Sequence, residues 1–199
     1  MTVGVWKVKE SHECLRSMFQ DFSIYEEGYA RFTSDKRKVE WLAVRALLKE
    51  LCGEEKSVSY YPSGKPYLTD GSARISFSHT QGYVAVAVHP CKEVAVDIEQ
   101  YGTRVKRVAH KFIRGDEQIP IEPLQEIQAL LLHWSAKETL YKLLDKEGVD
   151  FIRHLQVFPF ELVEEGEFVA CEHLTEQNEC FPVHYHTHPH YVLTYASRP

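Results

Sequence analysis

Two long helical segments, each accompanied by several short strands, constrain the fold of this chain more than any other feature. The spacing of apolar residues predicts one helix from about Thr33 to Leu51 and a longer one from about Leu124 to Leu144. Segments rich in β-branched and aromatic residues surround each helix, with glycine or proline turns between them. This order predicts an α+β protein of two similar lobes, each a helix packed on a small antiparallel sheet.

The expected strands fall on both sides of each helix. In the first half they lie at 3–8, 74–78, 83–88 and 93–98, and Gln81-Gly82 predicts a hairpin between the second and third. The stretch YYPSGKPYL is expected to be a turn. In the second half a short helix is expected at 105–112, and Gly148 is expected to end the long helix. Further strands are expected at 155–160, 167–173, 183–186 and 191–195.

The length of 199 residues fits one large domain or two small ones. We expect an N-terminal lobe of residues 1–99 and a C-terminal lobe of residues 100–199. No Ser/Gly-rich linker separates them, so the lobes are expected to pack closely. A cleft between such lobes is a common place for a ligand.

Composition narrows the class of protein. Twenty-nine acidic residues against 23 basic ones give a net charge of −6, which argues against a surface that grips nucleic acid throughout. No apolar run approaches the roughly 18 residues that cross a bilayer, and the N-terminus lacks the apolar stretch of a signal peptide. The five cysteines are far apart and form no CxxC pair, so we expect reduced thiols in a cytoplasmic protein.

The pair Ser78-His79 ends a predicted strand. Adjacent strand residues point to opposite faces, so this pair is not a nucleophile with its base. A hydroxyl, an imidazole and a backbone N–H at a strand end are suited to an anion such as phosphate. A polar strand end with no ligand is the alternative.

The acids Asp97 and Glu99 follow an apolar strand and are two residues apart. The period of a strand places both carboxylates on the same side. Two like charges need a counter-charge, and oxygen ligands suit a hard cation such as Mg²⁺. The alternative is an exposed, solvated strand end.

The long second helix contains the sequence HWSAKETLYK. Trp134, Glu138 and Lys142 recur every four residues and lie on one face of that helix. Glu138 and Lys142 are a surface ion pair in the simplest interpretation. The same two groups also suit a metal–phosphate site, because the carboxylate binds a cation and the ammonium neutralises a phosphate oxygen.

Taken in order, these stretches resemble the 4′-phosphopantetheinyl transferases. The matching sequences are SH, VAVDIE and WSAKETLYK, together with GKPYL at Gly64–Leu68, and they cover the chain from Lys36 to its last strands. The resemblance is to the larger type, in which one chain holds two lobes with the coenzyme between them. It departs at Ala95, where the family usually has glycine, and at 112–117, where two acids compete for one position.

The resemblance implies transfer of 4′-phosphopantetheine from coenzyme A to a serine of an acyl or peptidyl carrier protein. The other product is 3′,5′-adenosine bisphosphate. Three residues are implied to bind Mg²⁺: Asp97, Glu99 and Glu138. Lys142 is implied to contact the diphosphate. The base for the serine proton is implied to be Glu138, Asp116 or Glu117.

Most of the implied coenzyme contacts lie in the first half. Ser78 and His79 are implied to contact its phosphates, with His79 at the 3′-phosphate. Lys65 resembles the lysine of the GKP motif, near the nucleotide end. The implied basic residues of the first helix, facing the same phosphate, are Lys36, Arg37 and Arg45.

The basic segment that follows the strand of Asp97 and Glu99 is the expected docking surface for the carrier protein. The same resemblance implies that such carriers are acidic, so a basic surface would attract them. The basic docking residues are Arg104, Arg107 and Lys111, and Phe112 is expected in the apolar centre of the interface. The alternative is a solvated basic helix face.

Two other functions are open. One is a Mg²⁺-dependent phosphohydrolase that uses the same acids, and the other is an inactive transferase fold that binds metal through a His-rich segment. That segment contains His184, His186, His188 and His190. Pro189 interrupts it. Since two lobes in one chain would complete the site, a monomer is expected.

Overall fold

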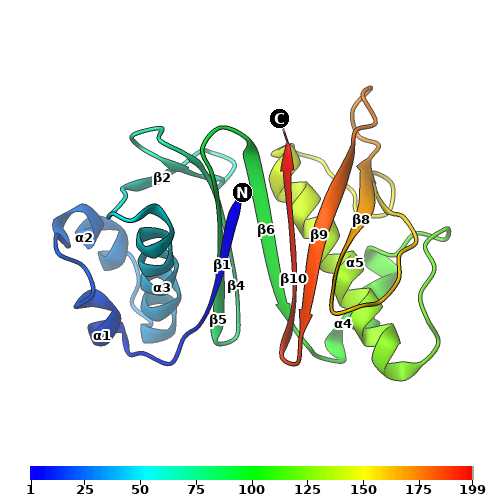
Figure 1. The fold of residues 1–199 in the computed structure, drawn as a ribbon, viewed down its shortest axis with the longest axis horizontal. Coiled ribbons are helices and arrows are strands. Elements are labelled where there is room, and N and C mark those ends of the chain that lie inside the picture. The colour runs from blue at the N-terminus through cyan, green and yellow to red at the C-terminus, as the bar shows by residue number, and fades with distance from the viewer. Residues whose placement is uncertain (199) are drawn as a thin grey trace. The chain divides into compact units, whose positions relative to one another are not determined.

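The computed structural model describes residues 1–198, and the chain divides into two compact units, Met1–Val94 and the residues from Ala95 onward. Each unit combines one long helix with antiparallel strands (Figure 1). The predicted α+β class is confirmed.

The first unit is organised around helix α3, Asp35–Cys52. The Ser34 side chain caps its first turn by accepting a hydrogen bond from the backbone N–H of Arg37, and Gly53 ends it with a φ of 75°. The helix packs on a three-stranded sheet of order β1-β5-β4, formed by Thr2–Lys7, Tyr83–His89 and Arg74–Thr80.

The β4–β5 hairpin confirms the connection expected at Gln81-Gly82, because Gly82 has a φ of 74° there. Along β4 the side chain of Ser78 is buried and that of His79 is exposed, as the alternation of a strand requires. His79 shares its face of the strand with Ile75 and Phe77, which pack against the core of the unit, and it lies at the exposed end of that face, beside α3.

Four further elements of this unit were not expected. They are α1 (His12–Arg16), α2 (Ser23–Ala30), β2 (Val58–Tyr60) and β3 (Pro66–Leu68). The segment predicted as a turn does turn at Gly64, which has a φ of 87°, but β2 and β3 pair on either side of it. These strands present Tyr60 and Pro66 beside α3.

The second unit contains a five-stranded sheet of order β6-β10-β9-β8-β7. The strands are Glu93–Gln100, Tyr191–Arg198, Cys180–His188, Glu165–Glu172 and Leu155–Val157. The strand β6 starts at the end of the first unit and continues into the second. It is followed by α4 (Arg104–Val108), the 3₁₀ turn η1 (Ala109–Lys111) and the long helix α5 (Pro123–Leu144).

Helix α5 packs on this sheet, chiefly on β10 (Figure 1). Two hydroxyls fix the contact, because Ser135 and Thr139 both bond the Thr194 hydroxyl, at 2.9 and 2.7 Å. The helix ends at Leu144, and the residue that caps it is Asp145, with a φ of 49°, and not Gly148. Asp145 occupies the left-handed position itself, and its N–H donates to the Tyr141 carbonyl.

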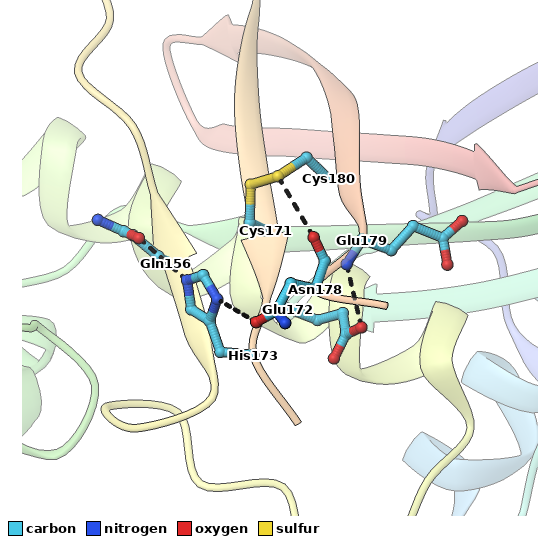
Figure 2. The surroundings of a disulfide bond; sticks show 7 residues. All are labelled: Gln156, Cys171, Glu172, His173, Asn178, Glu179 and Cys180. Carbon is cyan, nitrogen blue, oxygen red and sulfur yellow. Dashed lines mark hydrogen bonds between the residues drawn. A yellow bond between two sulfur atoms is a disulfide. The ribbon is translucent and has the colours of Figure 1, made fainter. Parts of the chain in front are cut away.

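The expectation of five reduced cysteines was wrong. Cys171 and Cys180 face each other in the β8–β9 register and form a disulfide (Figure 2). The loop between them is built on the buried carboxylate of Glu172, which accepts hydrogen bonds from the backbone N–H groups of Leu174, Thr175 and Glu179. The disulfide and this carboxylate hold the two ends of one loop together.

Candidate active site

Two acids at the end of β6 meet one face of α5. The indole N–H of Trp134 donates to a carboxylate oxygen of Glu99 at 2.7 Å. The ammonium of Lys142 donates to Asp97 at 2.7 Å and to the Val96 carbonyl at 3.0 Å. The two helix residues lie eight positions apart, with Glu138 midway between them on the same face.

Burial makes the negative charge of this group unfavourable. Burial and the charge of Asp97 raise the pKa of Glu99 to about 7, although the Trp134 hydrogen bond opposes the shift. Burial and Asp97 also raise the pKa of Glu138, with Lys142 acting in the opposite direction. The three carboxylates therefore share a site with the ammonium of Lys142, which is bonded to Asp97.

The chemistry of these donors fits a hard divalent cation, because several carboxylate oxygens close to each other lose their mutual repulsion when such an ion binds. Their positions are not those of a finished metal site. No group of three or more His, Cys, Asp or Glu residues between residues 1 and 198 is arranged to hold a metal ion. Lys142 is bonded to Asp97, so the ammonium occupies one carboxylate oxygen that a cation would use.

The other polar residues of the HWSAKETLYK sequence have structural contacts. Lys137 is 0% exposed, and its ammonium bonds the Glu117 carboxylate at 2.8 Å as well as the carbonyls of Phe112 and Phe151. Ser135 and Thr139 fix the helix to β10, as described above. Along this part of α5, residues that face β6 therefore alternate with residues that hold the second unit together.

The candidate bases Asp116 and Glu117 both have other partners. Glu117 is buried, and besides Lys137 it accepts the backbone N–H groups of Arg114 and Val157 at 2.8 Å each. The Asp116 carboxylate is paired with the Arg114 guanidinium at 2.9 Å. Glu138 has no such bonded partner in the described part of the chain.

A separate cavity of about 240 Å³ lies in the first unit, between α3 and the ends of β2 to β4. At its inner side the Arg45 guanidinium stacks on the Trp41 ring, 3.4 Å from the ring centroid, and donates to the Tyr60 hydroxyl at 3.2 Å. Arg37 and His79 also line it. The structure thus brings together three of the residues implied to contact the coenzyme phosphates.

Arg45 is 3% exposed, and no carboxylate among residues 1–198 is bonded to it. Burial lowers the pKa of its guanidinium, but an arginine keeps its charge in proteins. A buried cation that has only neutral hydrogen-bond partners favours an anionic ligand. The cavity is therefore a candidate anion site.

The remaining implied contacts do not line this cavity. Lys65 is paired with Glu93 at 2.6 Å and does not line the cavity, and Ser78 is buried. Lys36 is largely exposed near Glu40. Sequence reasoning missed Trp41 and Tyr60. The four-residue spacing of Trp41 and Arg45 on a helix was a usable signal for their stacking.

The basic segment that was expected to dock the carrier protein differs from the expectation at Phe112. Phe112 is 0% exposed and packs on Trp134 within the core of the second unit, so its assignment to a docking surface was wrong. Arg104, Arg107 and Lys111 are exposed, as a docking surface requires. Leu124 and Ile121 are also exposed, and Leu124 lines a cavity of about 610 Å³ with Tyr101.

The His-rich segment lies on β9 and in the turn after it. His184 and His186 face acidic partners across the strand pair, with Glu167 at 3.1 Å and Glu165 at 3.6 Å. The strand ends at His188, before Pro189. Each of these two imidazoles therefore has one carboxylate beside it.

Comparison with protein families places this region in a known superfamily. A model of the 4′-phosphopantetheinyl transferase superfamily matches residues 93–196, slightly more than half of the chain, from the start of β6 into β10. The chain belongs to this superfamily, whose members transfer phosphopantetheine from coenzyme A. Among curated proteins none matches it. No helix within residues 1–198 has the length and apolar character needed to cross a bilayer.

Proposed function

We propose that this protein transfers the 4′-phosphopantetheine group of coenzyme A to a serine of an apo acyl or peptidyl carrier protein. The observation that carries this proposal is the contact of the α5 stripe with the acids of β6, inside the region that matches the superfamily. The stripe places an indole, a carboxylate and an ammonium beside two further carboxylates. These groups suit a diphosphate and a divalent cation.

The reaction is a single phosphoryl transfer. The serine oxygen attacks the phosphorus on the pantetheine side of the diphosphate and forms a new P–O bond. The bond to the adenosine-side phosphate breaks, and 3′,5′-adenosine bisphosphate leaves with the electron pair. The serine proton passes to a carboxylate, for which we propose Glu138, because Asp116 and Glu117 are bonded to Arg114 and Lys137.

The metal in this proposal is Mg²⁺, with Asp97, Glu99 and Glu138 as its protein ligands. A divalent cation held by these residues would supply positive charge to the diphosphate. Lys142 exchanges its bond to Asp97 for one to a phosphate oxygen. Burial raises the pKa of Glu138, which makes its carboxylate a better proton acceptor than that of an ordinary glutamate.

The nucleotide end of coenzyme A is assigned to the cavity of the first unit. Arg45 supplies buried positive charge there, and Arg37 and His79 line the same cavity. The aromatic rings of Trp41 and Tyr60 give it an apolar wall. We propose that one chain suffices, since it holds both the anion site and the carboxylates.

The decisive experiment is mass spectrometry of an apo carrier protein after incubation with this protein, coenzyme A and Mg²⁺. The expected result is a gain of one phosphopantetheine, which EDTA abolishes. Asp97→Asn and Glu138→Gln should lose nearly all turnover and keep the fold, whereas Glu147→Gln, which neutralises an exposed acid just after α5, should keep activity. Consumption of coenzyme A without a carrier would indicate a phosphohydrolase. Full activity of Asp97→Asn in EDTA would exclude the metal assignment.

A further inference from the structure

The cavity of the first unit contains one acidic side chain. Glu40 of α3 is the only acid among the described residues that line it. One of its carboxylate oxygens lies 3.9 Å from the Arg37 guanidinium and 4.0 Å from the His79 imidazole, and the other lies 3.9 Å from the Lys36 ammonium. The carboxylate is thus central to three basic side chains.

The side chain of Glu40 is more deeply buried than the side chains of the three bases. The side chain of Glu40 is 16% exposed, whereas those of Lys36, Arg37 and His79 are 75, 61 and 45% exposed. The packing of α3 therefore fixes the carboxylate, and the bases extend from it toward solvent. All three separations exceed the length of a hydrogen bond, so the carboxylate acts through its charge.

The charge of Glu40 has two opposing effects on an anionic ligand: it holds the bases in place, and it repels the ligand. The larger of the two effects decides whether Glu40 strengthens or weakens binding. Exposed ion pairs contribute little, so Glu40 adds little by holding the bases in place. A phosphate bound by Arg37 and His79, the two of these bases that line the cavity, would lie close to the carboxylate, and both charges of a dianion are repelled by it. The repulsion therefore dominates.

We infer that Glu40 is a specificity-determining residue that weakens the binding of a phosphate group at this cavity. It thereby reduces the difference in affinity between a nucleotide that carries this phosphate and one that lacks it. The identity of the nucleotide rests on the proposed function. The bisphosphate product keeps the same phosphate after pantetheine has left, so Glu40 also weakens the binding of the product and favours its release.

The test compares the wild type with Glu40→Gln, which keeps the shape of the side chain and removes its charge. Dissociation constants are measured by calorimetry in EDTA for coenzyme A, dephospho-coenzyme A and 3′,5′-adenosine bisphosphate. Coenzyme A and the bisphosphate should bind the variant about tenfold more tightly, and dephospho-coenzyme A should change by less than about twofold. Glu40→Asp, which retains the charge, should resemble the wild type.

Glu50→Gln is the matched control, because it removes the same charge from an exposed position of α3, about 15 Å further along the helix. It should alter none of the three constants. Weaker binding of coenzyme A to Glu40→Gln would show that Glu40 positions the bases, and an equal change for coenzyme A and dephospho-coenzyme A would show that it contacts the nucleoside. Either result would overturn the inference.

A titration with inorganic phosphate, followed by NMR of the His79 ring, separates this inference from the proposed function. Glu40→Gln should bind inorganic phosphate more tightly than the wild type does, whether or not coenzyme A is the substrate. If that holds while coenzyme A fails to bind either protein, the proposed function is wrong and the inference stands. Equal phosphate affinity of the two proteins would refute the inference.

Discussion

Arg45 is buried and Glu99 is partly buried, and the two side chains respond to burial in different ways. The arginine cannot release its proton in a folded protein, so its buried charge favours an anion. The glutamate can take up a proton, and burial together with Asp97 raises its pKa to about 7. Arg45 therefore favours binding of an anion such as phosphate, and Glu99 favours binding of a proton or a metal ion.

The raised pKa of Glu99 predicts how stability depends on pH in the absence of metal. The folded protein keeps a proton on this carboxyl up to about pH 7, while the unfolded chain loses it near the ordinary value of 4.5. The unfolding free energy should therefore fall as pH rises through that interval, by at most about 3–4 kcal/mol, of which roughly half falls between about pH 5.5 and about pH 7.5. Denaturant unfolding in EDTA at about pH 5.5 and about pH 7.5 measures the change.

Glu99→Gln supplies the control, because it cannot titrate and should show a smaller fall over the same interval. A residual fall is expected from Glu138, whose pKa is raised in the same direction. Adding Mg²⁺ should raise the melting temperature of the wild type more at the higher pH, since protons compete with the cation for the same oxygens. Identical pH dependence of the variant and the wild type would contradict the assignment.

At the scale of the element, the ion pair of Lys137 and Glu117 joins α5 to the segment that precedes it. Replacing one partner leaves the other charge buried without a counter-ion, so Lys137→Met and Glu117→Gln should each lower the unfolding free energy by about 3–5 kcal/mol. The double variant should lose clearly less than the sum of the two. Urea unfolding of all four proteins gives the coupling energy, and additive losses would contradict the pairing.

The disulfide between β8 and β9 makes a second prediction at this scale. Unfolded, unreduced protein should show three reactive thiols, those of Cys14, Cys52 and Cys91, and all five after reduction. Reductant should lower the unfolding free energy by up to about 3 kcal/mol, since the closed loop is short. Cys171→Ala/Cys180→Ala should be insensitive to reductant. Five thiols before reduction would refute the bond.

The elements that the sequence predicts well are those with a long pattern and a clear end. Helix α3 has an N-terminal cap at Ser34 and a glycine at its end, and the β4–β5 hairpin has a turn that suits Gly82. Helices α1 and α2 have five and eight residues, and β2 and β3 have three each. So few residues give no readable period, and these elements are held by contacts with the rest of their unit.

Contacts between distant segments account for the rest. The disulfide depends on a strand register that places Cys171 opposite Cys180, and no local pattern specifies that register. Phe112 was assigned to the surface because basic residues surround it, but only the packing of α5 shows that it lies in the core. The stripe of Trp134, Glu138 and Lys142 was readable because its spacing is local.

At the scale of the whole molecule, net charge opposes the proposed encounter with an acidic carrier protein. The chain carries a charge of −6, so attraction has to come from a local patch. Arg104, Arg107 and Lys111 are exposed, and no carboxylate is paired with them among residues 1–198. Leu124 is apolar and exposed in the same unit, and we propose it for the role first expected of Phe112.

Reversing two of these charges, in Arg107→Glu/Lys111→Glu, should raise the KM for the carrier. Coulomb attraction between exposed groups is screened by salt, so the rise should be about tenfold or more at low ionic strength and much smaller at about 0.5 M salt. The KM for coenzyme A and the turnover at saturating carrier should change little, because neither residue belongs to the proposed chemistry. Initial rates at several carrier concentrations, measured at both salt concentrations, separate these constants.

The control has to separate a local patch from the overall charge. Lys146→Glu/Arg153→Glu changes the net charge by the same amount, at two exposed positions after α5. If the patch docks the carrier, this control should leave the carrier KM close to that of the wild type at both salt concentrations. Equal rises in the two variants would mean that only net charge matters. An unchanged KM in Arg107→Glu/Lys111→Glu at low salt would place the docking surface elsewhere.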